Sequence, residues 1–509
     1  MTAAPVRALD PEFRPYAWAP STEELARRAG RDPVEIVRFD GNVPALPLPS
    51  SRPGTLAAAL AEVNTYPHGG YTELEAAIAR YANVEAENVV LGAGADDLIL
   101  LCGRAFAGPG DTVAAPREPT YPLFRVAAQL AGARVGDESP ALTFCCRPGN
   151  PFGDLPELPG ARPLVVDEAY FEYAGETAAG LIHDEDVVVI RTFSKAFALA
   201  GARVGYLLAG RELAAELRAR QSPAPVATLS AALALAALRN PPGVDWVVEE
   251  RERLARELRG LGFEPLPSRT NFVFVPVLDP EALAEQLLRV AGCVVRALAG
   301  GVRISVRDRE DDDLLLAALA GSEPPPGRRA RTVRATAETA IRVRLGLDGS
   351  GRVRVQTGAG LYDHLFEQLG FHGGLDLVVE GAGDLDTGEH HTAEDTAIAI
   401  GEALDRALGD RAGIARFGSA VVPMDDALAE VAVDLGGRRG ASIALEQDPG
   451  LARHALESLA SAARLTLHVR AEGRDPHHVA EAAFKAVGRA LRAAVAREGE
   501  GLPSTKGRL

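Results

Sequence analysis

His390-His391-Thr392-Ala393-Glu394 organises the C-terminal part of this 509-residue chain, because the same pattern returns at His477-His478-Val479-Ala480-Glu481. On a helix, positions i and i+4 share one face, whereas position i+1 points about 100° away. The first histidine and the glutamate of each copy can therefore reach one metal ion, and the second histidine can reach another. Both copies are predicted to be helices that carry metal ligands.

A second pair of similar segments precedes the two copies. His364-Leu365-Phe366-Glu367-Gln368-Leu369 matches His454-Ala455-Leu456-Glu457-Ser458-Leu459, and strand-like segments follow at residues 375–378 and 465–468. The C-terminal part is therefore predicted to be an internal duplication whose halves each supply three histidines and one glutamate. Nitrogen-rich sets of this kind suit imidazole-binding transition metals. The predicted ligands are His364, His390, His391, Glu394, His454, His477, His478 and Glu481.

The other histidines do not follow this pattern. His372 and His468 each occur in only one half, so both are interpreted as structural residues or supports of the ligands. His68 and His183 are interpreted as ordinary loop histidines. The alternative is two unrelated surface helices with chance histidines, and the matched pair of motifs argues against it.

Composition and charge narrow the class of protein. The net charge of −16 argues against a nucleic-acid-binding surface and suits a soluble metabolic enzyme. The four cysteines form no CxxC motif and no disulfide framework, as expected in a reducing cytoplasm. There is no signal-like N-terminus and no run of about eighteen apolar residues. A cytoplasmic protein without nucleic-acid or membrane partners is expected.

A proline-rich stretch divides the chain. Residues 323–330 are predicted to be a linker between an N-terminal domain, 1–322, and a C-terminal domain, 331–509. In the first domain, apolar runs at 164–166 and 187–190 alternate with helical patterns, which indicates an α/β fold with mostly parallel strands.

The second domain is predicted to be α+β. Ile341, Val343 and Leu345 alternate with polar residues, as in a strand with one buried face. The turn-like sequence at 348–351 is expected to return the chain to Val353 and Val355 as a hairpin.

The chemistry of the first domain centres on Lys195, which directly follows an apolar strand. Hydroxyls at Thr192 and Ser194 and the cation Arg203 surround it in sequence, which suits a lysine–aldehyde Schiff base beside a phosphate. Asp167 ends another apolar strand, where a buried carboxylate can keep a pyridine nitrogen protonated. The glycine-containing segment 92–97 leads into a helical pattern whose first amides could cradle the phosphate.

In order and spacing, these motifs resemble a fold-type I pyridoxal-phosphate aminotransferase over roughly residues 35–310, and histidinol-phosphate aminotransferase most closely. The resemblance implies the α/β PLP-dependent transferase fold, with Lys195 as Schiff-base lysine and proton carrier and Asp167 on the pyridinium nitrogen. It implies a stacking role for Tyr121 and a substrate clamp at Arg303. It also implies that Tyr66 reaches the cofactor of a neighbouring subunit, hence a dimer. The remaining implied cofactor contacts are Ala95, Asp96, Asn150, Tyr170, Thr192, Ser194 and Arg203.

Three segments depart from that family's pattern. They are Asn42-Val43-Pro44, residues 147–153, and Arg307, which stands where a glycine is usual. These departures bear on substrate specificity and leave the cofactor residues in place.

From about residue 331 to 509 the chain resembles imidazoleglycerol-phosphate dehydratase, for example in Tyr362-Asp363-His364 and Arg416-Phe417-Gly418-Ser419. The resemblance implies that the same eight ligands bind two manganese ions, in sites completed between adjacent subunits of a cage of about 24 chains. It implies Glu338 as the acid/base carboxylate, for which the alternative is an exposed strand glutamate. The implied substrate contacts are Gln368, Arg416, Arg438, Ser504 and Lys506.

Together the two resemblances imply a bifunctional enzyme of histidine biosynthesis. The C-terminal domain would dehydrate imidazoleglycerol phosphate to imidazoleacetol phosphate, and the N-terminal domain would transaminate that ketone with glutamate to histidinol phosphate. The first domain could instead act on another amino acid, or be a catalytically silent scaffold for the dehydratase. A metal-storage module is disfavoured by Glu338 and the phosphate-type residues.

Overall fold

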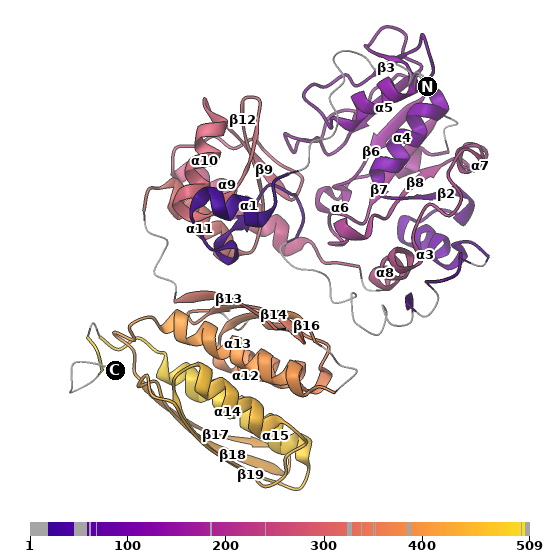
Figure 1. The fold of residues 1–509 in the computed structure, drawn as a ribbon. Helices are drawn as coiled ribbons and strands as arrows, with labels where there is room; N and C mark the ends of the chain where they lie inside the picture. Colours follow the sequence, from indigo (N-terminus) through magenta and orange to yellow (C-terminus); the bar gives the residue numbers. More distant parts are fainter. Residues whose placement is uncertain are drawn as a thin grey trace, which may run out of the picture. The chain divides into compact units, whose positions relative to one another are not determined.

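The computed structural model describes residues 19–44, 59–60, 63–67, 69–183, 186–239, 241–322, 328–336, 338–349, 351, 353–383, 388–499 and 501–503. The chain forms two compact units, Met1–Pro324 and Pro325–Leu509 (Figure 1). The boundary between the units falls within the predicted linker. Among the described residues, no helix is both long and apolar enough to cross a membrane.

A seven-stranded sheet in the order β2-β8-β7-β6-β5-β3-β4 forms the centre of the first unit. Strands β3 to β7 pair in parallel, and β8 runs antiparallel to β2 and β7. Every residue of β5, β6 and β7 is buried, as expected for strands covered on both faces. The bounds are β2 (Val89–Gly92), α4 (Ala95–Phe106), β3 (Thr112–Ala114), α5 (Leu123–Ala131), β4 (Arg134–Val135), β5 (Leu142–Cys146), β6 (Leu164–Asp167), α6 (Phe171–Ala174), β7 (Val187–Thr192), β8 (Gly205–Ala209) and α7 (Arg211–Ala219).

A smaller layer completes the first unit, with a sheet in the order β11-β12-β9 and a separate pair of β1 with β10. The segment after β1 is tied to β12, since the backbone N–H of Ser305 donates to the Phe39 carbonyl at 2.8 Å. The remaining elements are α1 (Thr22–Ala29), β1 (Val37–Arg38), α3 (Thr72–Ala82), α8 (Thr228–Leu238), α9 (Asp245–Gly260), β9 (Phe272–Pro276), α10 (Pro280–Ala291), β10 (Cys293–Val294), β11 (Arg296–Leu298), β12 (Gly301–Ser305) and α11 (Arg309–Leu319).

The second unit confirms the predicted duplication. Its two four-stranded sheets have the same topology, in the orders β13-β14-β16-β15 and β17-β18-β20-β19, and Figure 1 shows helices α12, α13, α14 and α15 lying between them. One hydrophobic core extends through both halves. The bounds are β13 (Arg329–Ala335), β14 (Thr339–Gly346), β15 (Val353–Gln356), α12 (Gly360–Gly373), β16 (Asp376–Gly383), α13 (His390–Leu408), β17 (Phe417–Met424), β18 (Ala427–Asp434), β19 (Gly440–Leu445), α14 (Ala452–Ala462), β20 (Thr466–Glu472) and α15 (Pro476–Ala494).

Two sequence predictions for this unit are wrong. β14 and β15 do not form a hairpin, because β14 pairs with β13 on one edge and β16 on the other, and β15 pairs in parallel with β16. Helix α12 makes the crossover that a parallel pair requires. In addition, Arg329 and Ala330 pair with Gly346 and Leu345, so the last two residues of the predicted linker belong to a strand.

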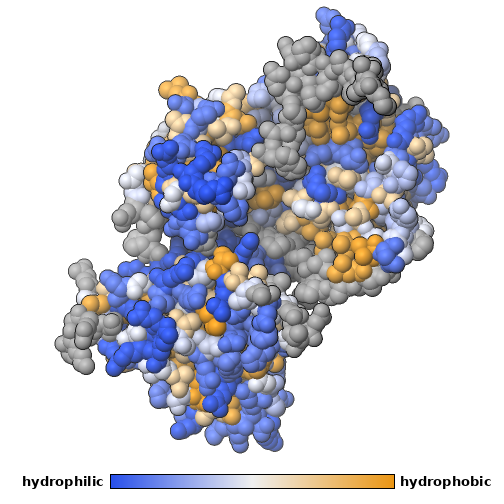
Figure 2. Space-filling model, viewed as in Figure 1, coloured by the Kyte–Doolittle hydropathy of each residue, from blue (hydrophilic) through white to orange (hydrophobic). Residues whose placement is uncertain are grey.

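The helices of the two halves cross closely at glycines. A Cβ at Gly488 of α15 would lie 2.4 Å from the Leu369 carbonyl oxygen of α12, and one at Gly401 of α13 would lie 2.6 Å from that of Leu459 on α14. Each crossing therefore joins a helix of one half to a helix of the other. On the face shown in Figure 2, hydrophilic residues predominate over this unit, with hydrophobic ones scattered among them.

Candidate active sites

A cavity of about 460 Å³ in the first unit gathers most of the residues predicted for that domain. It lies where β6 and β7 end, so Asp167 and Thr192 reach it from the ends of buried strands. Tyr66 does not line the described part of the cavity, and 83% of its surface is exposed. The predicted residues that line the cavity are Ala95, Asp96, Tyr121, Asn150, Asp167, Tyr170, Thr192, Ser194, Lys195, Arg203 and Arg303.

Burial changes the acidity of two groups in this cavity. It raises the pKa of the Asp167 carboxyl to about 7, against a hydrogen bond from the Ala169 backbone N–H that lowers it. Burial and the nearby Arg303 cation lower the pKa of Lys195 to about 8. A cationic ring nitrogen beside Asp167 would restore its ordinary charged state, and the lysine offers a free amine at near-neutral pH.

One end of the cavity is shaped for an anion. Helix α4 begins at Ala95 after Gly94, whose φ is +85°, and a Cβ on Gly94 would lie 2.6 Å from the Arg203 guanidinium. That guanidinium lies 2.9 Å from the Asp96 carboxylate and 3.5 Å from the Ser194 hydroxyl. Free helix amides, a hydroxyl and an arginine together suit a phosphate group.

The lining of the cavity also includes two arginines of the small sheet, Arg296 and Arg303. Arg303 donates to Asn150 Oδ1 at 2.6 Å and to the Asp40 carbonyl at 3.1 Å, while its Nε has no hydrogen-bond partner among the described residues. Arg296 is its direct partner across the β11–β12 pair and also lines the cavity. Like charges directly opposite each other on a sheet are unfavourable, so an anionic ligand between them would be stabilised.

Sequence reasoning missed Arg296 and the role of Asn42. Asn42 is 1% exposed, has a φ of +50° and donates to the Tyr170 hydroxyl at 3.0 Å. The turn at Ala299-Gly300 could have identified Arg296, because a tight hairpin places it opposite Arg303. Arg307 turns away from the described cavity lining and pairs with Asp311 at 2.7 Å.

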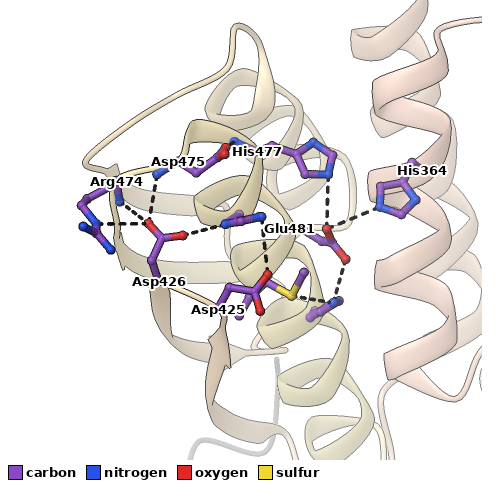
Figure 3. A network of polar contacts seen from close by, with 10 residues as sticks. His364, Asp425, Asp426, Arg474, Asp475, His477 and Glu481 are labelled. Carbon is purple, nitrogen blue, oxygen red and sulfur yellow. Dashed lines mark hydrogen bonds and ion pairs between the residues drawn. The ribbon is translucent and has the colours of Figure 1, made fainter.

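In the second unit, His364, His477 and Glu481 form one cluster of possible metal ligands. Their ligand atoms lie within 4.8 Å of one another, and Figure 3 shows His364 reaching the cluster from a separate helix, α12. His364 Nε2 and His477 Nε2 lie 3.6 and 3.3 Å from Glu481 Oε2. Burial acts to raise the pKa of Glu481, but Lys485 at 2.7 Å and His364 outweigh it and lower the pKa.

His390, Glu394 and His454 form the matching cluster. His390 Nε2 and His454 Nε2 lie 3.6 and 3.5 Å from the two oxygens of Glu394. His454 Nε2 is buried and has no hydrogen-bond partner among the described residues, so a metal ion would satisfy it. Bonds of about 2.0–2.2 Å from two imidazoles and a carboxylate fit both clusters, so the donors suit a divalent transition metal.

The other two predicted ligands lie outside these clusters, each beside a carboxylate. His391 Nδ1 is 3.2 Å from Glu338 Oε2, and His478 Nδ1 is 2.6 Å from Asp426 Oδ1. Asp426 also accepts from the backbone N–H groups of Arg474 and Asp475 (Figure 3). In each half, the second histidine of the motif therefore contacts a carboxylate that does not belong to either cluster.

The predicted substrate contacts of this unit are spread out. Gln368 follows His364 by one turn of α12, whereas Arg438 lies exposed in the loop after β18. Arg416 pairs with Asp434 at 2.7 Å and donates to the Pro503 carbonyl at 2.8 Å. Ser504 and Lys506 lie outside the described residues.

Comparisons with known proteins match each unit to a family. The family described as aminotransferase class I and II matches residues 40–137 and 144–319, and the family described as imidazoleglycerol-phosphate dehydratase matches 357–491.

Individual relatives agree with these matches. Imidazoleglycerol-phosphate dehydratases of Parafrankia sp. and Methanococcoides burtonii are 50% and 48% identical to the chain over 191 and 188 residues, which is 35% of this chain and 98% of each relative. The crystal structure of histidinol-phosphate aminotransferase from Sinorhizobium meliloti in complex with pyridoxal-5'-phosphate is 26% identical, with a TM-score of 0.52. That match covers 62% of this chain and 98% of the other.

Proposed function

This chain belongs to two families, the class I and II aminotransferases and the imidazoleglycerol-phosphate dehydratases, and we infer that it is a bifunctional enzyme of histidine biosynthesis. The second unit dehydrates imidazoleglycerol phosphate to imidazoleacetol phosphate. The first unit transaminates this ketone with glutamate, giving histidinol phosphate. The product of one unit is thus the substrate of the other, so each assignment supports the other.

The pair of Arg296 and Arg303 carries the substrate assignment of the first unit. Both substrates end in an anion, a phosphate on the ketone and a carboxylate on glutamate. Two guanidinium groups directly opposite each other across β11 and β12 can bind either one, and such a ligand would relieve their mutual repulsion. An apolar amino acid would bring only its α-carboxylate to these two cations, whereas glutamate brings a second carboxylate.

The residues of the cavity have separate roles in transamination. Bound pyridoxal phosphate would supply an electron sink for the bond changes at the substrate carbon. Lys195 would hold the cofactor and move a proton at Nζ, and its lowered pKa leaves part of it as the free amine near neutral pH. Asp167 would pair with the ring nitrogen, while Arg203 and Ser194 would hold the phosphate beside the start of α4.

The two histidine–glutamate clusters carry the dehydratase assignment. Two manganese ions held there would act as Lewis acids on the imidazole ring of the substrate. Glu338 would move a proton at Oε2, a role supported by its half-exposed carboxylate beside His391. The hydroxyl leaves as water from the carbon attached to the ring, a proton leaves the neighbouring carbon, and the resulting enol becomes the ketone.

Coupled turnover tests this function. Purified protein supplied with imidazoleglycerol phosphate, glutamate, pyridoxal phosphate and Mn²⁺ should produce histidinol phosphate. Accumulation of the ketone alone, with no change of cofactor absorbance on adding glutamate, would favour a silent scaffold. Conversion of a different amino acid in preference to glutamate would refute the substrate assignment of the first unit.

The assembly we propose is a dehydratase core of about 24 chains with paired aminotransferase units. It is supported by His391 and His478, which lie outside the two clusters, and by Tyr66, which is exposed and does not line the described part of the cavity. Light scattering of metal-loaded protein should give a particle above a megadalton from 53.5 kDa chains. A plain dimer at working concentration would refute the cage.

A further inference from the structure

The turn between β13 and β14 carries Glu338, and a carboxylate on α13 holds this turn. Asp395 accepts from Arg334 Nε at 2.6 Å and from the Thr339 hydroxyl. The Thr336 hydroxyl lies 3.2 Å from that of Thr339 and accepts from the backbone N–H of Glu338 at 3.2 Å. Asp395 is only 7% exposed. This Asp395 network, made of Arg334, Thr336, Thr339 and Asp395, connects the ligand-bearing helix to the backbone of Glu338.

The second half of the unit builds the same hairpin and helix without this network. β14 and β18 have equal lengths, and their last residues, Gly346 and Asp434, pair with the first residues of the matched strands β16 and β20. Counting back from these residues, Glu338 of the first half corresponds to Asp426 of the second, and the helix motifs align His390 with His477. The network residues Arg334, Thr336, Thr339 and Asp395 then correspond to Val422, Met424, Ala427 and Ala482.

The duplicate shows that the fold does not require the polar network. Val422 and Met424 pack against the hydrophobic core, and Ala427 and Ala482 are buried. At these four positions apolar residues suffice, while Asp426 in the turn accepts instead from the backbone N–H groups of Arg474 and Asp475. A buried carboxylate destabilises a protein unless it is fully hydrogen-bonded. The charged and hydroxyl groups of the first half therefore need an explanation other than stability of the fold. The half that has the network is the half that carries Glu338.

We propose that Asp395 is a positioning residue for dehydration, which fixes the backbone of Glu338 so that its carboxylate stays beside His391. The inference rests on the proposed acid/base role of Glu338. The Glu338 side chain is 53% exposed, so its own packing does not hold it, whereas Thr336 and Thr339 fix the turn from which it projects. A misplacement of about 1 Å in a catalytic group can reduce the rate by about 100-fold.

The test installs residues of the second half in the first. The double variant Thr339→Ala/Asp395→Ala should fold with an unchanged metal content, because the duplicate already uses alanine at both positions. Its kcat for dehydration should fall about ten- to 100-fold with little change in KM. Thr336→Val should act in the same direction, and Thr336→Ser should restore the rate. Metal content and the thermal midpoint are measured for each variant.

Thr332→Val is the matched control. It removes the hydrogen bond of 3.0 Å that the Thr332 hydroxyl on β13 donates to the Ala399 carbonyl on α13, and it leaves the turn between β13 and β14 unchanged. The rate of this variant should stay within about twofold of the parent, because the hydrogen bond that it loses joins Thr332 to Ala399 and not to the turn that carries Glu338. A loss as large as that of the Asp395 variant would overturn the positioning role.

A double-mutant cycle separates positioning from general support of the fold. Asp395→Asn should slow the parent enzyme but cause no further loss in Glu338→Gln, since the residue it positions is already inactive. Equal losses in both backgrounds would overturn the positioning role and leave the acid/base role of Glu338 standing. Full activity of Glu338→Gln alone would overturn that acid/base role, and this inference with it.

Discussion

Gly488→Ala should weaken metal binding although Gly488 is not a ligand. A Cβ at this position would lie 2.4 Å from the Leu369 carbonyl oxygen, whereas ordinary contact begins near 3.4 Å. Helices α12 and α15 would have to separate by about 1 Å, the difference between these two distances. His364 reaches Glu481 and His477 across this crossing, and ligand distances must hold within about 0.2 Å.

Gly488→Ala should lower both the stability of the unit and its affinity for metal. Overpacking should destabilise the metal-free unit by about 1–3 kcal/mol, partly offset by about 1 kcal/mol from the better helix propensity of alanine. Metal affinity at the His364 cluster should fall by at least about ten- to 100-fold, the loss caused by misoriented ligands. Calorimetric titration of metal into stripped protein measures the affinity, and circular dichroism measures the thermal midpoint.

Two other glycines serve as controls. Gly360→Ala, on α12 with no atom within 4 Å of the added Cβ, should leave both quantities unchanged. Gly401→Ala should affect the His390 cluster instead, because it separates α13 from α14. Unaltered affinity for both ions in Gly488→Ala would refute the idea that the helix crossing sets the ligand geometry.

Three further predictions concern Lys195 and the histidines. Lys195→Ala should abolish transamination and leave dehydration intact, as product analysis would show; an equal fall in dehydration by well-folded protein would contradict independent sites. The binding of pyridoxal phosphate to the cofactor-free protein, measured by absorbance, should increase with pH around a midpoint near pH 8. The reason is that the lowered pKa of Lys195 makes its amine available below the ordinary pKa of 10.5. A midpoint near pH 10.5 would contradict this. His391→Ala and His478→Ala should lower metal content without changing cofactor absorbance, while His468→Ala should retain both ions; full metal occupancy in the first two would disprove their role as ligands.

Much of this protein could be inferred from local patterns. The repeated histidine motifs predicted the duplication and the helices α13 and α15, because side-chain direction along a helix depends only on spacing. Lys195 and Asp167 could be placed at strand ends for a similar reason, since a buried parallel strand is a continuous apolar run with a defined end. The two families and the pair of activities followed from these motifs.

Tertiary packing decided what no local pattern encodes. The motifs did not show that His364 joins the ligands of the other half, because that partnership depends on the close crossing of α12 and α15 at Gly488. The expected hairpin of β14 with β15 does not form because β16 pairs with the edge of β14 that β15 would have needed. The Asp395 network likewise joins a turn to a helix far along the chain, and only the folded backbone brings their hydrogen-bonding groups together.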